Sequence, residues 1–220
     1  SASFVSMQRS FHDFLVERGN SPESVFGDTL AAVNSGGFYM SRPTTPAELD
    51  AIRLEDALAF HRRLFANAAD FTFFMVGAFQ VDSVAPLIER YVASLPSVGH
   101  RTSDFVARGP RYPAGVRRVV VRRGSEPKSS TRITFFVNDG LEELDLHRAR
   151  SCASILTEHL RQSLREMLGG TYSATASFSF LSPLPGYATM SIAFGCAPGR
   201  IDSMVATALA EVRELRDTGP

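Results

Sequence analysis

The strongest structural constraint in this sequence is a long helix that ends in two glycines and leads directly into an alternating strand. Apolar residues recur at three- and four-residue steps, as on one face of a helix: Ala149, Cys152, Leu156, Leu160 and Leu164. Gly169 and Gly170 then close the helix, because glycine readily adopts the left-handed backbone that ends one. A period-two alternation follows, with Tyr172, Ala174, Ala176, Phe178 and Phe180 on one side and Ser173, Thr175, Ser177 and Ser179 on the other. This helix–glycine–strand corner is predicted to hold Arg165 and Tyr172 in a fixed relation.

Composition excludes several classes of function. The chain has 220 residues, of which 44% are hydrophobic, and it carries 23 Lys or Arg and 23 Asp or Glu residues. Because the net charge is zero, the chain has no overall positive field that would attract nucleic acid. No apolar run is long enough to span a membrane, and no signal peptide is recognisable. Because the chain begins with Ser1 rather than Met and stops soon after a helix, we expect it to be a piece of a longer protein.

The order of the predicted elements indicates an α+β fold with a mixed, mostly antiparallel sheet and helices packed on one face. Helix starts are marked by Ser21-Pro22 and by the capping box Thr45-Pro-Ala-Glu48. The predicted helices span 4–16, 45–67 (with a break), 81–95, a long segment before Gly169, and a last segment from Pro198; the predicted strands span 71–77, 116–123, 131–138, 171–180 and 187–194. The second helix is expected to bury Leu49, Ile52, Leu58, Leu64 and Phe65, and the last one Ile201, Met204, Val205, Ala208, Val212 and Leu215.

Candidate metal ligands and nucleophiles are sparse. The histidines are His12, His61, His100, His147 and His159, and none forms a His-x-x-Glu-His pair that would place two imidazoles on one helix face. We therefore expect no catalytic zinc in this chain, and we expect His147 and His159 to be surface residues or hydrogen-bonded structural residues. Cys152 and Cys196 are predicted to be small core thiols, with a disulfide or a reactive thiol as alternatives. No serine lies in a nucleophile elbow.

Two motifs carry a family resemblance. The run LREMLGGTYSA (164–174) and the later strand YATMSIAFGCAP (187–198) resemble the C-terminal half of insulinase/pitrilysin-type zinc metallopeptidases, closest to the long bacterial putative zinc proteases. The resemblance covers residues from about Phe26 to the end. It implies an insulinase- or mitochondrial-processing-peptidase-like metallohydrolase fold, zinc in an N-terminal catalytic half, a peptide substrate, and a bacterial, periplasmic location.

The same resemblance gives Arg165 and Tyr172 a role. In the family, an arginine and a tyrosine seven positions apart reach from the non-catalytic half to a substrate bound at zinc in the other half, and these two residues match that spacing. A guanidinium and a phenol can stabilise the oxyanion of peptide hydrolysis. The residues alone allow a structural alternative, in which the arginine neutralises the helix C-terminus and the tyrosine packs in the sheet.

The resemblance also suggests domain boundaries. Residues 1–96 resemble the tail of one peptidase-like domain, 97–115 a linker rich in Gly and Pro, and 116–220 the front of the next domain. We expect the two parts to merge into one compact unit, within one chain or by exchange in a homodimer. The predicted function is that of a non-catalytic chamber wall that is inactive alone. The alternatives are an inactive scaffold subunit and a module that binds a peptide along a sheet edge.

Two further stretches are predicted to be ordinary surface features. The loop 124–130 lacks phosphate-loop spacing and is predicted to be a turn, with contact to the substrate chamber as the alternative. The arginine pairs Arg117-Arg118 and Arg122-Arg123 are predicted to be solvated charges that discourage edge pairing, with a weak anion site as the alternative.

Overall fold

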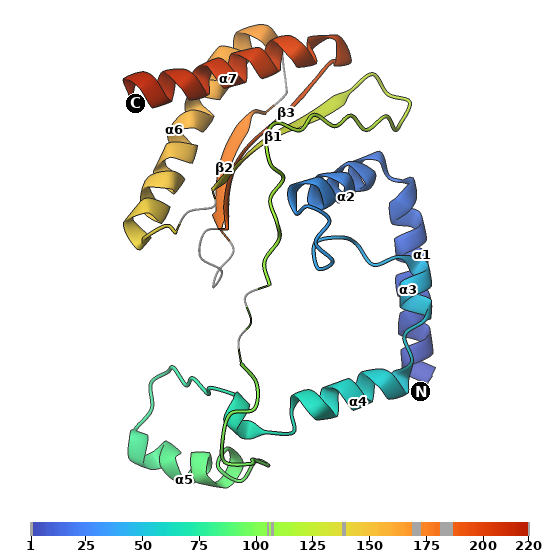
Figure 1. Cartoon of the computed structure of the whole chain (residues 1–220), viewed down its shortest axis with the longest axis vertical. Coiled ribbons are helices and arrows are strands. Elements are labelled where there is room, and N and C mark those ends of the chain that lie inside the picture. The colour runs from blue at the N-terminus through green and yellow to red at the C-terminus, as the bar shows by residue number, and fades with distance from the viewer. Residues whose placement is uncertain are drawn as a thin grey trace. The chain divides into compact units, whose positions relative to one another are not determined.

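The computed structural model describes residues 2–104, 106, 108–137, 140–168, 173–180 and 187–219, without the side chains of 165–168. Figure 1 shows the whole chain. It divides into two compact units. The first unit comprises Ser1–Asn20 and Thr44–Arg108, and the second comprises Ser21–Pro43 and Gly109–Pro220. No helix in the described ranges is both long enough and apolar enough to cross a membrane.

The second unit is built on a three-stranded antiparallel sheet. Its strands are β1 (Ser129–Val137), β2 (Thr175–Phe180) and β3 (Ala188–Cys196), in the order β1-β3-β2. In this register Ile133 and Ala176 both pair with Ile192. Helices α6 (Glu143–Leu168) and α7 (Ile201–Thr218) cover one face of the sheet, and the short helix η2 (Pro198–Arg200) leads into α7 (Figure 1). The predicted α+β fold with helices on one face is confirmed.

The core of the second unit lies between this sheet and the two long helices. The buried residues that make up the cluster are Leu156, Leu160, Leu164, Ala174, Ile192, Phe194, Cys196, Met204 and Ala208. Ile201, Val205, Val212 and Leu215 pack against it, so the predicted buried face of the last helix is confirmed. Both thiols are free, with Cys196 in the core and Cys152 partly buried, as predicted for small core side chains.

The opposite face of the sheet is largely polar, and the end of α2 (Pro22–Asn34) contacts it at Thr134. The predicted N-cap of α2 is confirmed, because the Ser21 hydroxyl accepts a hydrogen bond from the backbone N–H of Ser24. At the other end of α2, Asn34 donates to the hydroxyl of Thr134, 3.2 Å away, whose strand neighbours Ile133 and Phe135 face the core. On β2 and β3, hydroxyl groups pair across the strands: Ser177 with Ser191 and Ser179 with Thr189.

The first unit is helical and buries little apolar surface. It contains α1 (Ala2–Asn20), α3 (Pro46–Asp50), α4 (Leu54–Leu64), η1 (Ala68–Asp70) and α5 (Val81–Tyr91). The capping box at Thr45 and the break between α3 and α4 are as predicted. The expected burial of the α3–α4 face is wrong: Ile52, Leu58, Leu64 and Phe65 are each 45–54% exposed. Helical periodicity marks an apolar face, but a second surface must cover that face before it is buried.

Two predicted strands are also wrong. Phe71–Gly77 and Val116–Arg123 belong to no strand of the structure. Their side chains are correspondingly open, with Val76 and Val116 both 99% exposed. A β-strand needs backbone hydrogen bonds to a neighbouring strand, and within the described residues neither segment makes them. The predicted boundaries at residues 96 and 116, and the merging of the two parts, stay predictions.

A polar knot ties η1 to the chain that leaves the first unit. Asn67 is only 7% exposed, and its amide donates to the carbonyl of His100 (3.0 Å) and accepts from the N–H of Val98 (3.1 Å). The Asp70 carboxylate accepts from the hydroxyl and the N–H of Thr102, at 2.7 and 2.6 Å. These hydrogen bonds hold the pKa of Asp70 below its usual range, and the bond from the Thr102 hydroxyl contributes most.

Replacing Asp70 with asparagine is expected to loosen this knot and to remove its pH dependence. A depressed folded pKa stabilises the knot above the unfolded value of about 3.9, and this stabilisation is lost as pH falls through the folded pKa. Hydrogen exchange of the Thr102 amide measures the effect. Protection in the parent chain should decline below about pH 4, whereas Asp70→Asn should give lower protection at pH 7 and a flatter profile. Asp104→Asn in the same loop is the control, and equal profiles for the two variants would contradict the prediction.

Candidate functional site

The predicted functional corner begins at the C-terminal end of α6. Arg165 lies in the last turn of this helix, directly after Leu164. Leu160 and Leu164 are both 0% exposed, so this end of the helix is anchored in the core beside Ala174, which is 1% exposed. The side chain of Arg165 and the whole of Tyr172 lie outside the residues that the structure describes. The structure therefore gives the position of the helix end but does not test how the two side chains lie.

The strand that follows the corner confirms the predicted alternation from Ser173 to Ser179, whereas Phe180 at its end is 40% exposed. Ala174 is buried and Ala176 and Phe178 are partly buried, whereas Ser177 and Ser179 are exposed. The side-chain hydroxyl of Thr157 on α6 accepts a hydrogen bond from the N–H of Ala176 (2.9 Å). It also lies 3.2 Å from the carbonyl oxygen of the same residue. The helix and the start of β2 are therefore joined by polar contacts as well as by the apolar core.

A serine, a histidine and a glutamate meet between α6 and α7, but not in the order that nucleophilic catalysis needs. The Ser163 hydroxyl donates to the Glu211 carboxylate, and His159 Nδ1 lies 3.6 Å from the other oxygen of Glu211. In a catalytic triad the imidazole contacts the serine and takes its proton. Here the carboxylate lies between the two, so this cluster links the helices. It confirms the structural role predicted for His159, and His147 is exposed as predicted for a surface residue.

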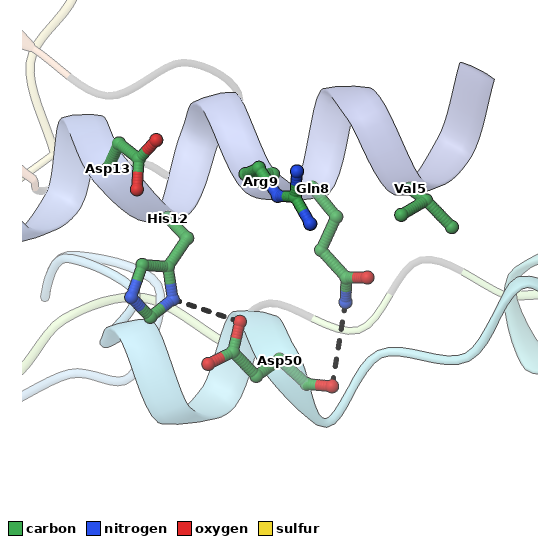
Figure 2. A pocket seen from close by; sticks show the side chains of 6 residues that line it. All are labelled: Val5, Gln8, Arg9, His12, Asp13 and Asp50. Atoms are coloured by element: carbon green, nitrogen blue, oxygen red, sulfur yellow. Dashed lines mark hydrogen bonds and ion pairs between the residues drawn. The ribbon is translucent and has the colours of Figure 1, made fainter. Parts of the chain in front are cut away.

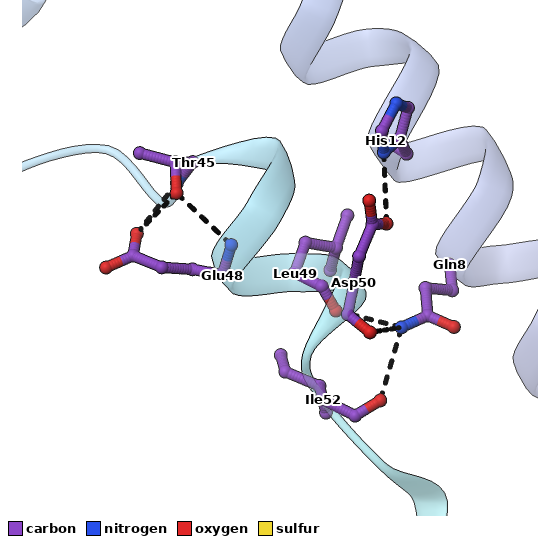
Figure 3. A network of polar contacts seen from close by, with 7 residues as sticks. All are labelled: Gln8, His12, Thr45, Glu48, Leu49, Asp50 and Ile52. Carbon is purple, nitrogen blue, oxygen red and sulfur yellow. Dashed lines mark hydrogen bonds and ion pairs between the residues drawn. The ribbon is translucent and has the colours of Figure 1, made fainter.

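A hollow of about 400 Å³ in the first unit is lined by Val5, Gln8, Arg9, His12, Asp13 and Asp50. Figure 2 shows His12 and Asp50 pointing toward one another, with His12 Nδ1 and the Asp50 carboxylate 3.0 Å apart. Gln8 donates its side-chain amide to carbonyl oxygens at the end of α3, at 2.8 Å for Leu49 and 3.2 Å for Ile52 (Figure 3). These contacts satisfy carbonyls that a helix end leaves open. The polar groups of the hollow thus hold α1 to α3.

No group of three His, Cys, Asp or Glu side chains suited to a metal ion occurs in the part of the chain that the structure describes. The sequence also lacks His-x-x-Glu-His. The residues present therefore do not fit a catalytic zinc ion, and no chemical step is assigned to a metal held by this chain.

Sequence reasoning missed two of these features. The Asn67–Asp70 knot connects residues about 30 positions apart, and only the helix-start preference of asparagine hinted at it. The Ser163–Glu211 contact joins two helices whose polar positions look like ordinary solvated faces in the sequence. Both are structural, and neither adds a reacting group.

The fold of this chain is also found in solved structures of peptidases. The crystal structure of the periplasmic protease PqqL from Escherichia coli superposes with a TM-score of 0.81 and 22% identity. The superposition covers 96% of this chain and 23% of that one. Residues 51–220 match the family described as the peptidase M16 inactive domain. The chain belongs to this family, which confirms the predicted resemblance.

Two curated relatives carry protease names. "Zinc protease PQQL-like" of Arabidopsis thaliana is 24% identical over 216 residues, which span 92% of this chain and 23% of the relative. "Probable zinc protease PqqL" of Escherichia coli is 31% identical over 156 residues, which span 70% of this chain and 16% of the relative. The chain thus spans less than a quarter of the length of either relative.

Proposed function

We propose that this chain is the non-catalytic C-terminal portion of a longer zinc-dependent endopeptidase and forms part of the wall of its substrate chamber. The match of residues 51–220 to the peptidase M16 inactive domain carries this proposal. The protease names of both curated relatives support it, as does the absence of a His-x-x-Glu-His motif from this sequence. Zinc is then supplied by an N-terminal half of the same protein, and the substrate is a peptide. Because the Escherichia coli relative is described as periplasmic, a periplasmic location is part of the proposal.

The finer part of the proposal assigns Arg165 and Tyr172 to the substrate. Attack on a peptide carbonyl develops negative charge on its oxygen, and donors fixed in advance near that oxygen lower the barrier. A guanidinium offers a permanent charge in a planar fork, and a phenol offers one directed O–H donor. The end of α6 is anchored in the core by Leu160 and Leu164, so it can hold such a donor in position. The two residues stand at the junction between a helix and a strand, and their separation of seven positions matches that of the arginine–tyrosine pair in the family.

The coarse proposal is tested by truncating the longer protein just before Ser1. The truncated protein should keep its zinc, measured by atomic absorption, and should lose hydrolysis of a quenched fluorescent peptide. The full-length protein is the control. A truncated protein that hydrolyses the peptide at the full-length rate would overturn the chamber-wall role. A full-length protein that holds zinc but hydrolyses no peptide in a broad library would favour the inactive-scaffold alternative instead.

A further inference from the structure

The basic residues of this chain are concentrated in one stretch. Between residues 101 and 132 there are nine Lys or Arg residues and only two Asp or Glu residues, although the whole chain has 23 of each. Four of the nine form the pairs Arg117-Arg118 and Arg122-Arg123 on either side of three valines. The chain as a whole is therefore neutral, but this stretch is strongly positive.

Three of the four arginines in these two pairs have no ion-pair partner among the described residues. Arg118 forms an ion pair with Asp202, and both side chains are well exposed. Lys128, just beyond, is engaged by Glu23 and Glu126, which raise its pKa through hydrogen bonds and charge. In the described ranges, Arg117, Arg122 and Arg123 are exposed and have no ion-pair partner. Three guanidinium groups are thus available to an outside ligand.

The backbone that carries these arginines is also unpaired. Among the described residues, no backbone hydrogen bond involves residues 116–123, although the sequence VRRVVVRR has strand character. Two of the three central valines are open to solvent, with Val119 53% and Val120 68% exposed, and Val121 is partly buried. Gly115 and Gly124 bound the segment, and both have positive φ angles, 67° and 83°. The segment is thus bounded by two glycines, and its backbone donors and acceptors are free in the described structure.

We infer that residues 116–123 are a docking segment for an extended acidic peptide, which pairs with them as an added β-strand. This inference rests on the proposed function, because it names the class of peptide that the chamber prefers. Main-chain hydrogen bonds supply binding energy in such a pairing, and side chains supply selectivity. In an extended segment, Arg122 lies on one side and Arg117 and Arg123 on the other, so carboxylates on either face of the peptide meet an unpaired guanidinium.

The same features argue against nucleic acid as the ligand. Single-stranded nucleic acid is usually bound by aromatic side chains that stack on the bases, beside a basic groove. No aromatic residue occurs between Pro113 and Thr134. Valines and a free extended backbone instead suit another polypeptide in the β conformation.

The test uses the 220-residue chain and a fluorescein-labelled peptide of alternating Glu and Val, with fluorescence anisotropy as the measurement. The matched peptide has Gln at each Glu position. We expect the acidic peptide to bind at micromolar concentration and the Gln peptide to bind at least about tenfold more weakly. The double variant Arg122→Glu/Arg123→Glu should lose about tenfold in affinity or more. Arg148→Glu/Arg213→Glu, on exposed positions of α6 and α7, makes the same charge change elsewhere and should bind like the parent chain.

A second pair of variants tests the backbone. Val120→Pro removes one N–H donor and should weaken binding, whereas Val120→Ala keeps the donor and should weaken it less. Equal binding by both charge-reversal doubles, or equal binding by the two Val120 variants, would overturn the proposal. So would tighter, Arg122-dependent binding of a single-stranded oligonucleotide or of phosphatidylserine vesicles. If the acidic peptide fails here while truncation of the longer protein still abolishes hydrolysis, the docking segment is wrong and the proposed function stands.

Discussion

Replacing Arg165 with alanine in the longer protein is expected to lower kcat for peptide hydrolysis by a factor of about 10²–10³ while zinc is retained. This is the range seen when one donor to a developing oxyanion is removed. The effect should fall on kcat more than on KM, because the charge that the guanidinium neutralises is largest in the transition state. Steady-state kinetics with a quenched fluorescent peptide, together with zinc analysis of each preparation, measures both quantities.

Two further variants separate this role from a structural one. Tyr172→Phe removes one O–H donor without changing the ring and should also lower kcat. Arg161→Ala removes an exposed arginine one turn earlier on α6, where it pairs with Glu158 at 2.7 Å, and should leave turnover unchanged. If Arg165→Ala and Arg161→Ala have the same kcat, Arg165 serves the helix end through the macrodipole and not the substrate.

The elements around this corner could be predicted because their signals are local. The apolar stripe that ends at Leu164 and the alternation that starts at Ala174 each mark one face that prefers the core. The second unit contains both the helix and the sheet, so the two faces can bury each other. Ser21 and Thr45 cap their helices within three residues, so their sequence signatures were sufficient.

The predictions that failed depend on partners that sequence does not specify. An apolar run such as Phe71–Gly77 indicates a strand, but a strand forms only where another backbone lies beside it. Phe74 is 86% exposed, so within the described residues this run has no such neighbour. The same reasoning applies to the α4 side chains Leu58 and Phe60. In both places the sequence identified an apolar surface correctly and could not identify what covers it.

The candidate site was predictable only in part. The position of Arg165 at a helix end follows from the glycines after it, and the structure has it in the last turn of α6. The relation between its side chain and Tyr172 remains a prediction. The knot around Asn67 shows the limit of local reasoning, because its side-chain amide donates or accepts six hydrogen bonds with residues spread from Ala69 to Thr102. Contacts of this range depend on tertiary structure that no short motif encodes.

Replacing Leu160 with alanine is expected to lower the free energy of unfolding of the second unit by about 2–5 kcal/mol. Leu160 is 0% exposed and belongs to the cluster that joins α6 to Ile192 of β3 and Met204 of α7. Truncation removes buried methyl groups and leaves a cavity that close-packed neighbours fill only partly. Urea unfolding followed by far-ultraviolet circular dichroism measures the change.

Leu144→Ala is the matched control, because it makes the same substitution on the same helix at a residue that is 57% exposed. It should change the unfolding free energy by no more than about 0.5 kcal/mol. A similar loss in both variants would mean that the core does not lie between α6 and the sheet. The anchoring proposed for Arg165 would then lose its physical basis, since Leu160 and Leu164 hold that helix end in the core through the same packing.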